Sequence, residues 1–456
     1  MKGTSANAST EADPSRPPAA VTLRAATAFW ARIGCLSFGG PAGQIALMHE
    51  ELVQRRRWIS ERRYLHALNY CMLLPGPEAQ QLATYIGWLM HGTLGGIIAG
   101  VLFVLPSLLI LIVLSWLYVA FGDVPVVEGV FYGIKPAVTA IVVQASHRIA
   151  SRSLKHPALW AIAAASLVAI FALSVPFPLI VLGAALLGVL GGRMAPAVFE
   201  AGGGHAASDA RDKVAAIIDD DTPTPEHARY RPARLLQVVA AGLALWALPM
   251  ALLAGTLGWA HTYTQMAWFF TTAALLTFGG AYAVLPYVYQ GAVQHYGWVT
   301  PTQMIDGLAL GETTPGPLIM VVAFVAFIGG YGQALLGPDA TFVAGACAAV
   351  LVTWFTFLPS FVFILAGGPL VEATHENIRF TAPLTAITAA IVGVVVNLAL
   401  FFAWHVLWPA GFDGAFEWPA ALIAIAAAIA LLKYKRGVIE VLACAALAGL
   451  AVQLLA

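Results

Sequence analysis

Two long runs of this chain, residues 95–121 and 383–404, are apolar and contain no Lys, Arg, Asp or Glu. At about 1.5 Å of rise per helical residue, each can span the roughly 30 Å hydrocarbon core of a bilayer. Of the 456 residues, 60% are hydrophobic and 10% are charged, against about 25% charged in soluble proteins. Because the runs are apolar on all sides, they indicate membrane-spanning helices and exclude a transmembrane barrel. The lipid bilayer is therefore an expected partner.

Charge and cysteine content exclude other classes. The formal net charge is zero, so nothing indicates a nucleic-acid partner. The scattered residues Cys35, Cys71, Cys347 and Cys444 have no metal-ligand spacing, and no HExxH motif occurs. We therefore predict neither a metal nor a cofactor. The first 23 residues lack the apolar core of a signal peptide.

Two clusters of helix-breaking residues interrupt the apolar sequence of the first half. They are 38–41 (FGGP) and 75–77 (PGP), and the loop between them carries five arginines. Proline lacks an N–H donor and glycine costs about 1 kcal/mol in a helix, so segments 24–48 and 66–91 are predicted to be broken helices. Inside a bilayer, broken backbone is tolerated where protein or a water-filled cavity covers it. The breaks are therefore candidate ligand sites.

The second half repeats these landmarks. Phe278-Gly279-Gly280 follows the first Phe-Gly-Gly by 240 residues (278 − 38), and Trp298 and Pro315-Gly316-Pro317 keep this offset from their counterparts. Leu358-Pro359-Ser360 follows Leu105-Pro106-Ser107 by 253 residues, which indicates an insertion between the landmarks. The series predicts an internal duplication. Ala281 stands where the first copy has a proline, so the halves need not bind a ligand symmetrically.

Charge predicts that the two repeats are inverted. The arginine-rich loop has a counterpart, 290–303, without Lys, Arg, Asp or Glu. The positive-inside rule then places the first loop in the cytoplasm and the second outside. An extra helix at 235–258 supplies the crossing that inverts the second half, as in many secondary transporters.

The predicted fold is an all-α polytopic membrane protein with two inverted-topology repeats that contain broken or re-entrant helices. If each broken segment enters and leaves on one side, all basic regions lie in the cytoplasm and the helices make nine crossings. Kinked segments that cross fully are the alternative. The predicted organisation is a polar tail at 1–23, a first repeat at 24–193, a flexible cytoplasmic linker at 194–234, a connecting helix at 235–258 and a second repeat at 259–456.

The breaks predict an anion site. A helix that begins inside the membrane presents unpaired N–H groups and about half a positive charge at its N-terminus. Pro77 and Pro317 would be first-turn prolines, while Gly76 and Gly316 would let the backbone approach a ligand. With the two Gly-Gly clusters, four such ends would converge near the bilayer midplane. Alternatively, these residues only allow kinks or close helix packing.

Charged residues within apolar stretches cost about 2.5 to 3.5 kcal/mol to insert and are functional candidates. Arg32 and Lys135 could neutralise an oxyanion or form salt bridges. Glu78 and Glu312 could cap helices or exchange protons, and we expect Asp306 to be structural. Polar side chains near the breaks could bind the anion or their own helix backbone. The candidate substrate-binding residues are Arg32, Phe38, Gly39, Gly40, Pro41, Gln44, Pro75, Gly76, Pro77, Glu78, Gln81, Lys135, Phe278, Gly279, Gly280, Glu312, Thr313, Thr314, Pro315, Gly316 and Pro317.

Five stretches resemble the chromate ion transporter family in its long, two-domain form: 37–41 (SFGGP), 55–58 (RRRW), 74–79 (LPGPEA), 81–87 (QLATYIG) and 312–318 (ETTPGPL). The resemblance implies export of chromate across the bacterial inner membrane and chromate resistance. It also implies importance for Arg32, Glu78 and the break motifs. A homodimer is a further assembly to consider.

Export of a dianion needs no ATP, because each charge is worth about 2.3 kcal/mol per 100 mV of membrane potential. Accordingly, no Walker-type GxxxxGK[ST] motif occurs. We predict potential-driven export, with proton exchange through Glu78 or Glu312 as an added feature. A carrier of sulfate or another oxyanion is the second hypothesis. A membrane-embedded enzyme is a remote third, because the sequence shows no catalytic dyad or metal cluster.

Overall fold

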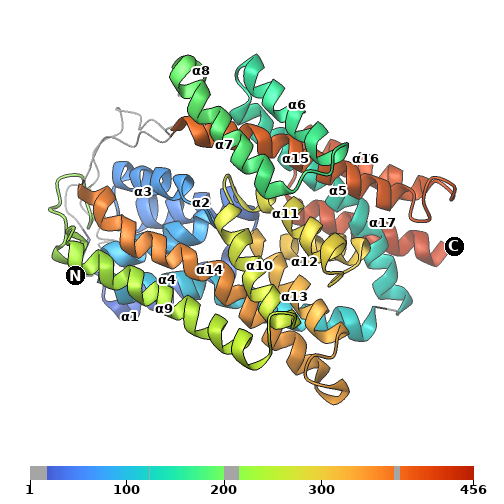
Figure 1. Cartoon of the computed structure of the whole chain (residues 1–456), viewed down its shortest axis with the longest axis horizontal. Helices are drawn as coiled ribbons and strands as arrows, with labels where there is room; N and C mark the ends of the chain where they lie inside the picture. The colour runs from blue at the N-terminus through green and yellow to red at the C-terminus, as the bar shows by residue number, and fades with distance from the viewer. Residues whose placement is uncertain (1–17, 123, 200–214, 374–380, 456) are drawn as a thin grey trace, which may run out of the picture.

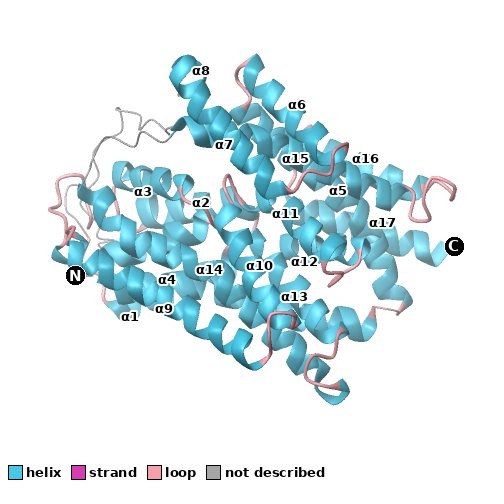
Figure 2. Ribbon diagram, viewed as in Figure 1, coloured by secondary structure: helices cyan, strands magenta, loops and turns pink. Residues whose placement is uncertain are grey.

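The computed structural model describes residues 18–122, 124–199, 215–373 and 381–455, and these residues form helices joined by loops (Figure 2). Within these described ranges, seven helical regions are long and apolar enough to cross a membrane. Six are the helices α4 (Glu78–Phe121), α5 (Pro125–Ser153), α7 (Phe177–Met194), α9 (Pro232–Thr256), α15 (Thr381–Leu407) and α17 (Val438–Leu455), and the seventh contains α14 (Thr341–Ala373). The predicted all-α polytopic membrane protein is confirmed.

The predicted breaks separate pairs of helices in both halves. In the first half, α1 (Leu23–Leu36) is followed by α2 (Gly40–His49), and α3 (Glu61–Leu73) by α4. In the second half, α10 (Thr262–Leu276) is followed by α11 (Ala281–Tyr289), and α12 (Pro301–Thr313) by α13 (Val321–Gly332). The glycines and prolines therefore interrupt the helices where the sequence predicts. Within α4, His91 and Gly92 have non-helical dihedral angles, so α4 has a second interruption.

The two halves share local structure at the same offset as their motifs. A π-helical turn follows α2 at Glu50–Arg55, and another follows α11 at Gln290–His295. After each turn a tryptophan N–H donates a 2.7 Å hydrogen bond into it, from Trp58 to Leu52 and from Trp298 to Ala292. These shared details support the predicted duplication. The orientation of the two repeats across a membrane stays a prediction.

The two halves are interlocked through their last helices. In the first half, α6 (Pro157–Phe171) and α7 pack on α15, which belongs to the second half. In the second half, α16 (Trp418–Leu432) and α17 pack on α5, which belongs to the first (Figure 1). Helices α5 and α15 also contact each other. Each half therefore completes the packing of the other, around the central α5–α15 pair.

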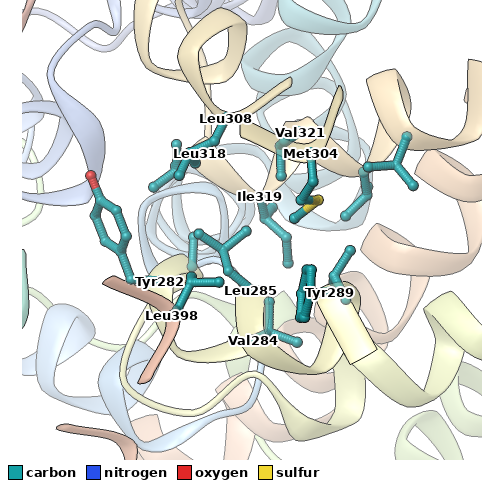
Figure 3. Close-up of a cluster of buried hydrophobic side chains, with 14 of the residues drawn as sticks. Tyr282, Val284, Leu285, Tyr289, Met304, Leu308, Leu318, Ile319, Val321 and Leu398 are labelled. Carbon is teal, nitrogen blue, oxygen red and sulfur yellow. The ribbon is translucent and has the colours of Figure 1, made fainter. Parts of the chain in front are cut away.

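We call residues 40–73 the first inner segment and residues 281–313 the second inner segment, and their packing differs. The second packs against α5 and α15, and eight of the nine residues of α11 are buried. It belongs to the largest apolar cluster, part of which Figure 3 shows. In the first inner segment, two of the ten residues of α2 are buried. Its apolar side chains belong to a separate cluster with α1 and α4. The repeats thus share their helices but not the packing of their inner segments.

The linker between the halves differs from the sequence expectation. We predicted a flexible segment at 194–234, but residues 216–222 and 226–234 form defined contacts with the first half. Ile218 and Ala228 are buried in the same apolar cluster as the first inner segment. We predicted flexibility from the polar composition of the linker, and composition does not reveal contacts of this kind. Residues 1–17, 200–214 and 374–380, which include parts of the predicted tail and linker, lie outside the described residues.

Candidate functional site

The four break motifs meet in two pairs, each of which joins one half to the other. The N–H of Gly76 donates a 2.7 Å hydrogen bond to the carbonyl oxygen of Thr277, and the N–H of Gly316 donates a 2.8 Å bond to that of Ser37. Gly316 and Thr277 each lie 240 residues after their counterparts Gly76 and Ser37. Equivalent residues therefore make the same hydrogen bond twice. One bond runs from the first half to the second, and the other from the second half to the first. The structure brings together the motifs that the sequence singled out.

Glycine is required at both of these contacts between the halves. Gly76 has φ +124° and Gly316 has φ +107°, a backbone region that side chains strongly disfavour. A Cβ atom on Gly76 would lie 2.5 Å from the Oγ of Ser360, and one on Gly316 would lie 2.7 Å from the Cβ of Ser107. Ser107 and Ser360 belong to the repeated Leu-Pro-Ser landmarks. Each Leu-Pro-Ser landmark thus lies against the Pro-Gly-Pro motif of the opposite half.

The helices that begin at the breaks have open N-termini. Among the described residues, no side chain caps the N-terminus of α2, α4 or α11. A Cβ atom built on Gly40 or Gly280 would meet nothing within 4 Å, so space is free beside both. Uncapped N–H groups next to free space can bind an anion by donating hydrogen bonds to it. Phe38, beside the first Gly-Gly pair, is 37% exposed, and Phe278 packs partly buried at the edge of the large apolar cluster.

Two glutamine side chains donate hydrogen bonds to the backbone of the break motifs. The Nε2 of Gln44 donates to the carbonyl oxygens of Gly316 and Ser37, the latter at 3.2 Å. The Nε2 of Gln81 donates to the carbonyl oxygen of Pro75 at 2.8 Å and lies 3.3 Å from the Oγ of Ser360. Both glutamines are fully buried, and their Oε1 atoms have no partner in the described part of the chain. An unpaired buried carbonyl costs about 1 to 3 kcal/mol, and a water or a hydrogen-bearing ligand would relieve this cost.

The two cationic candidates have different surroundings. Arg32 lies on α1 with its side chain exposed, and no ion pair of Arg32 occurs within the described ranges. The Nζ of Lys135, on α5, lies 3.7 Å from the carboxylate of Asp306 on α12. Asp306 is buried and accepts a 2.9 Å hydrogen bond from Tyr118. The salt-bridge alternative is therefore realised for Lys135.

The two glutamate candidates also differ. Glu78 is the first residue of α4 and is partly exposed. Glu312 is buried near the end of α12 and accepts a hydrogen bond from the hydroxyl of Tyr282, on α11. In Figure 3 the Tyr282 hydroxyl points away from the labelled apolar side chains. Glu312 therefore sits in a polar environment enclosed by the second inner segment.

The threonines next to the second Pro-Gly-Pro motif bind their own helix. The Oγ1 of Thr313 donates to the carbonyl oxygen of Leu310 at 3.0 Å, and that of Thr314 donates to Gly311 at 3.2 Å. This is the ordinary alternative that threonine hydroxyls have near a helix end. Their hydroxyl protons are thus already used within α12.

The arginines at the tip of the first inner segment are largely engaged in pairs. Arg55 and Arg56 bind the carboxylate of Glu51 at 3.0 and 3.1 Å. Arg56 also lies over the rings of Phe29 and Trp58. Burial raises the pKa of Glu51, but the hydrogen bonds and charges of Arg56 and Arg55 outweigh burial, so the pKa lies below 4.5. These two arginines stabilise the tip.

Sequence reasoning missed Ser107, Ser360, Gln80 and Tyr282. The two serines were visible as repeat landmarks, but nothing in the sequence linked each to the glycine of the opposite half. Gln80 is fully buried with an unpaired Oε1 among the described residues. Its position beside Gln81 was the available signal. In the described residues, no group of three His, Cys, Asp or Glu side chains could hold a metal.

Comparison with known proteins gives consistent similarities. The model of the chromate transporter family matches residues 25–189 and 264–450, once in each half. A chromate transport protein of Pseudomonas aeruginosa is 34% identical over 373 residues, which cover 80% of this chain and 77% of that protein. A chromate transport protein of Cupriavidus metallidurans is 28% identical, covering 91% and 89%. A probable chromate transport protein of Synechococcus elongatus is 27% identical, covering 83% and 84%. No solved structure matches this chain.

Proposed function

This chain belongs to the chromate transporter family, and on that premise we propose that it carries chromate, or a closely related tetrahedral oxyanion, across the membrane. The relatives are named as transport proteins, which supports a transporter rather than an enzyme. Chromate is a tetrahedral dianion without an apolar surface. Its site must therefore supply hydrogen-bond donors and positive potential in a region where lipid supplies neither.

One observation carries the proposal: the reciprocal bonds Gly76–Thr277 and Gly316–Ser37 join the four break motifs in two pairs, each between the halves. Uncapped helix starts lie at these motifs, with free space beside Gly40 and Gly280. The positive ends of the helices then favour an anion without burying a fixed cation. We assign the anion site to these motifs, with Gln44 and Gln81 holding the backbone in place.

We assign export as the direction, driven by the membrane potential. Each charge that crosses is worth about 2.3 kcal/mol per 100 mV. Two charges give about 4.6 kcal/mol outward from a negative interior, equal to a gradient above about a thousandfold. Export by this route lowers cytoplasmic chromate and would confer chromate resistance. We place the protein in the bacterial inner membrane, with inverted repeats and with the N-terminus and linker in the cytoplasm.

Proton exchange is assigned to Glu312 rather than Glu78. Glu312 is buried and accepts a hydrogen bond from the hydroxyl of Tyr282. A buried carboxylate that accepts a hydrogen bond from a neutral hydroxyl is suited to carry a proton. Glu78 is partly exposed at the start of α4, where its charge opposes an anion at the helix N-terminus unless it is protonated.

Sulfate is the second candidate substrate, because the groups at the motifs are backbone N–H groups and amides that recognise shape and charge. The experiment is chromate uptake into everted vesicles from cells that express the chain, with increasing sulfate as competitor. We expect saturable chromate uptake, absent from control vesicles, and a raised chromate tolerance of the cells. Uptake equal to that of control vesicles would contradict the proposal. Inhibition at equal sulfate concentrations would assign a general oxyanion carrier.

A further inference from the structure

The linker docks on the tip of the first inner segment. The N–H of Ile218 donates to the carbonyl oxygen of Trp58 at 3.0 Å, and the N–H of Ser60 donates to that of Ile218 at 2.9 Å. The bonds form a short parallel bridge between Ile59 and Ile218. Both isoleucines are buried, at 1% and 6% exposure. At this point the linker is part of the packed structure rather than a free tether.

Arg63 joins the linker, the first inner segment and the second half of the chain. Its Nη1 donates to the carbonyl oxygen of Thr222 in the linker at 3.3 Å. Its Nη2 pairs with Glu372, at the end of α14, at 2.6 Å. Glu372 is 4% exposed and also accepts a hydrogen bond from Tyr85 on α4. Loss of one partner would leave a buried charge uncompensated, so this pair fixes the start of α3 firmly.

The linker continues along α4 and is anchored there. The Nε2 of His227 lies 2.9 Å from the carbonyl oxygen of Trp88. Arg234 donates to the carbonyl oxygen of His227 at 2.6 Å and to the Oγ1 of Thr93 at 3.1 Å. These contacts lie on both sides of the interruption at His91 and Gly92. The linker therefore has two separate attachments, residues 216–222 on the first inner segment and residues 226–234 on α4.

The second inner segment is held differently. In the described residues, its tip has no linker contact of this kind, and it is held by packing on α5 and α15. The first inner segment lacks comparable packing on these two helices in the same ranges. The linker hydrogen bonds and the Arg63–Glu372 ion pair add to the apolar cluster that the first inner segment shares with α1 and α4. Of the two inner segments, the first is therefore the one whose position depends on contacts with the linker.

We propose that Arg63 is a positioning residue for transport. With linker residues 216–222 it forms a clasp that holds the first inner segment, and the clasp opens in each transport cycle. This inference rests on the proposed function, because the first inner segment carries Gly40 and Pro41 and leads directly into the first Pro-Gly-Pro motif. Its displacement breaks the Gly316–Ser37 and Gly76–Thr277 contacts and opens the anion site. Arg63 acts through the position of these motifs and does not touch the anion.

A reversible cross-link tests whether the clasp must open. In a chain whose four cysteines are replaced by serine, Ile59→Cys with Ile218→Cys places two thiols on bridged residues, where disulfide geometry can be met. Oxidation should lower chromate flux at least tenfold, and a reductant should restore it. The single variants are the controls and should not respond to oxidation. Unchanged flux in the cross-linked protein would overturn the proposal.

A labelling experiment tests Arg63 without relying on transport. Cys71 lies on α3 and is fully buried, so a chain that keeps only this cysteine reports exposure of the first inner segment. Arg63→Gln should speed maleimide labelling of Cys71 severalfold, and Arg63→Lys, which keeps the charge, should restore slow labelling. Arg62→Gln is the matched control, because Arg62 is exposed and has no ion pair in the described ranges.

Two results separate the clasp from the proposed function. Arg63→Gln should change the maximal chromate flux while leaving the half-saturating concentration within about twofold. Labelling of Cys71 no faster in Arg63→Gln than in Arg62→Gln would overturn the clasp, whatever the transport result. If the native chain transports no chromate, the proposed function fails, while the labelling ratio still decides whether Arg63 holds the segment.

Discussion

The Nζ of Lys135 lies 3.7 Å from the carboxylate of Asp306, and this ion pair ties α5 of the first half to the second inner segment. Asp306 is 1% exposed, and its Oδ1 has no partner among the described residues. The contact crosses the same boundary between halves as the glycine contacts at the break motifs. The second inner segment is therefore held by an ion pair as well as by apolar packing.

Lys135→Ala should destabilise the protein, because it leaves the buried Asp306 carboxylate with Tyr118 as its one neutral donor in the described ranges. The double variant Lys135→Ala with Asp306→Ala should be less destabilised than the sum of the two single variants. We expect a coupling of about 0.5 to 3 kcal/mol. Thermal unfolding in detergent measures it. Additive effects would show that the two charges do not interact.

Gly316→Ala should abolish at least nine tenths of chromate transport. The added Cβ meets the Cβ of Ser107 at 2.7 Å and forces a side chain onto a backbone with φ +107°. Flux in everted vesicles, normalised to protein amount, measures the effect. Gly183→Ala is the matched control, because a Cβ there meets nothing within 4 Å. Equal flux in the two variants would exclude a role for this contact between the halves.

Gln44→Leu should weaken the apparent affinity for chromate about tenfold. The change removes the donor to Gly316 and Ser37, and an unsatisfied buried group costs about 1 to 3 kcal/mol. The half-saturating chromate concentration measures the loss. Val284, the counterpart of Gln44 in the second repeat, already lacks such a donor, so Val284→Leu is the control. A larger loss in Val284→Leu would contradict the assignment.

Glu312→Gln should remove the pH dependence of transport while leaving potential-driven flux measurable. The amide can still accept a hydrogen bond from Tyr282 but cannot carry a proton. Flux measured at several pH values under a constant imposed potential tests this. Glu128→Gln, at an exposed position in the first turn of α5, is the control. A native pH profile in Glu312→Gln would remove proton exchange from the account.

Arg62 and Thr302 are counterparts at the 240-residue offset, and both are exposed. If the repeats are inverted, a cysteine at one position should react with an impermeant maleimide in intact spheroplasts and a cysteine at the other only in everted vesicles. We expect Thr302→Cys to react from outside and Arg62→Cys from the cytoplasm. Reaction of both from one side would show parallel repeats.

The broken helices were predictable because glycine and proline act locally. Gly39-Gly40-Pro41 and Pro315-Gly316-Pro317 interrupt their helices whatever lies around them. The hydrogen bond from the N–H of Gly316 to the carbonyl oxygen of Ser37 was not predictable, because a bond between distant backbone groups leaves no pattern in the sequence. The docking of Ile218 on Ser60 was hidden in the same way, since the polar linker composition suggested flexibility. The charge pattern allowed a salt bridge for Lys135 and a structural role for Asp306, but it could not pair the two residues, because they lie far apart in the sequence.

The central claim is that the break motifs, paired between the two halves of the chain, form an oxyanion site. The membrane potential then drives export of the oxyanion through this site. The most direct measurement is the initial rate of chromate entry into proteoliposomes that contain purified protein, under imposed potentials of both signs. A positive interior should accelerate entry several-fold relative to zero potential, a negative interior should suppress it, and Gly316→Ala should abolish the response. Chromate entry that ignores the sign of the potential, or that persists unchanged in Gly316→Ala, would contradict the account.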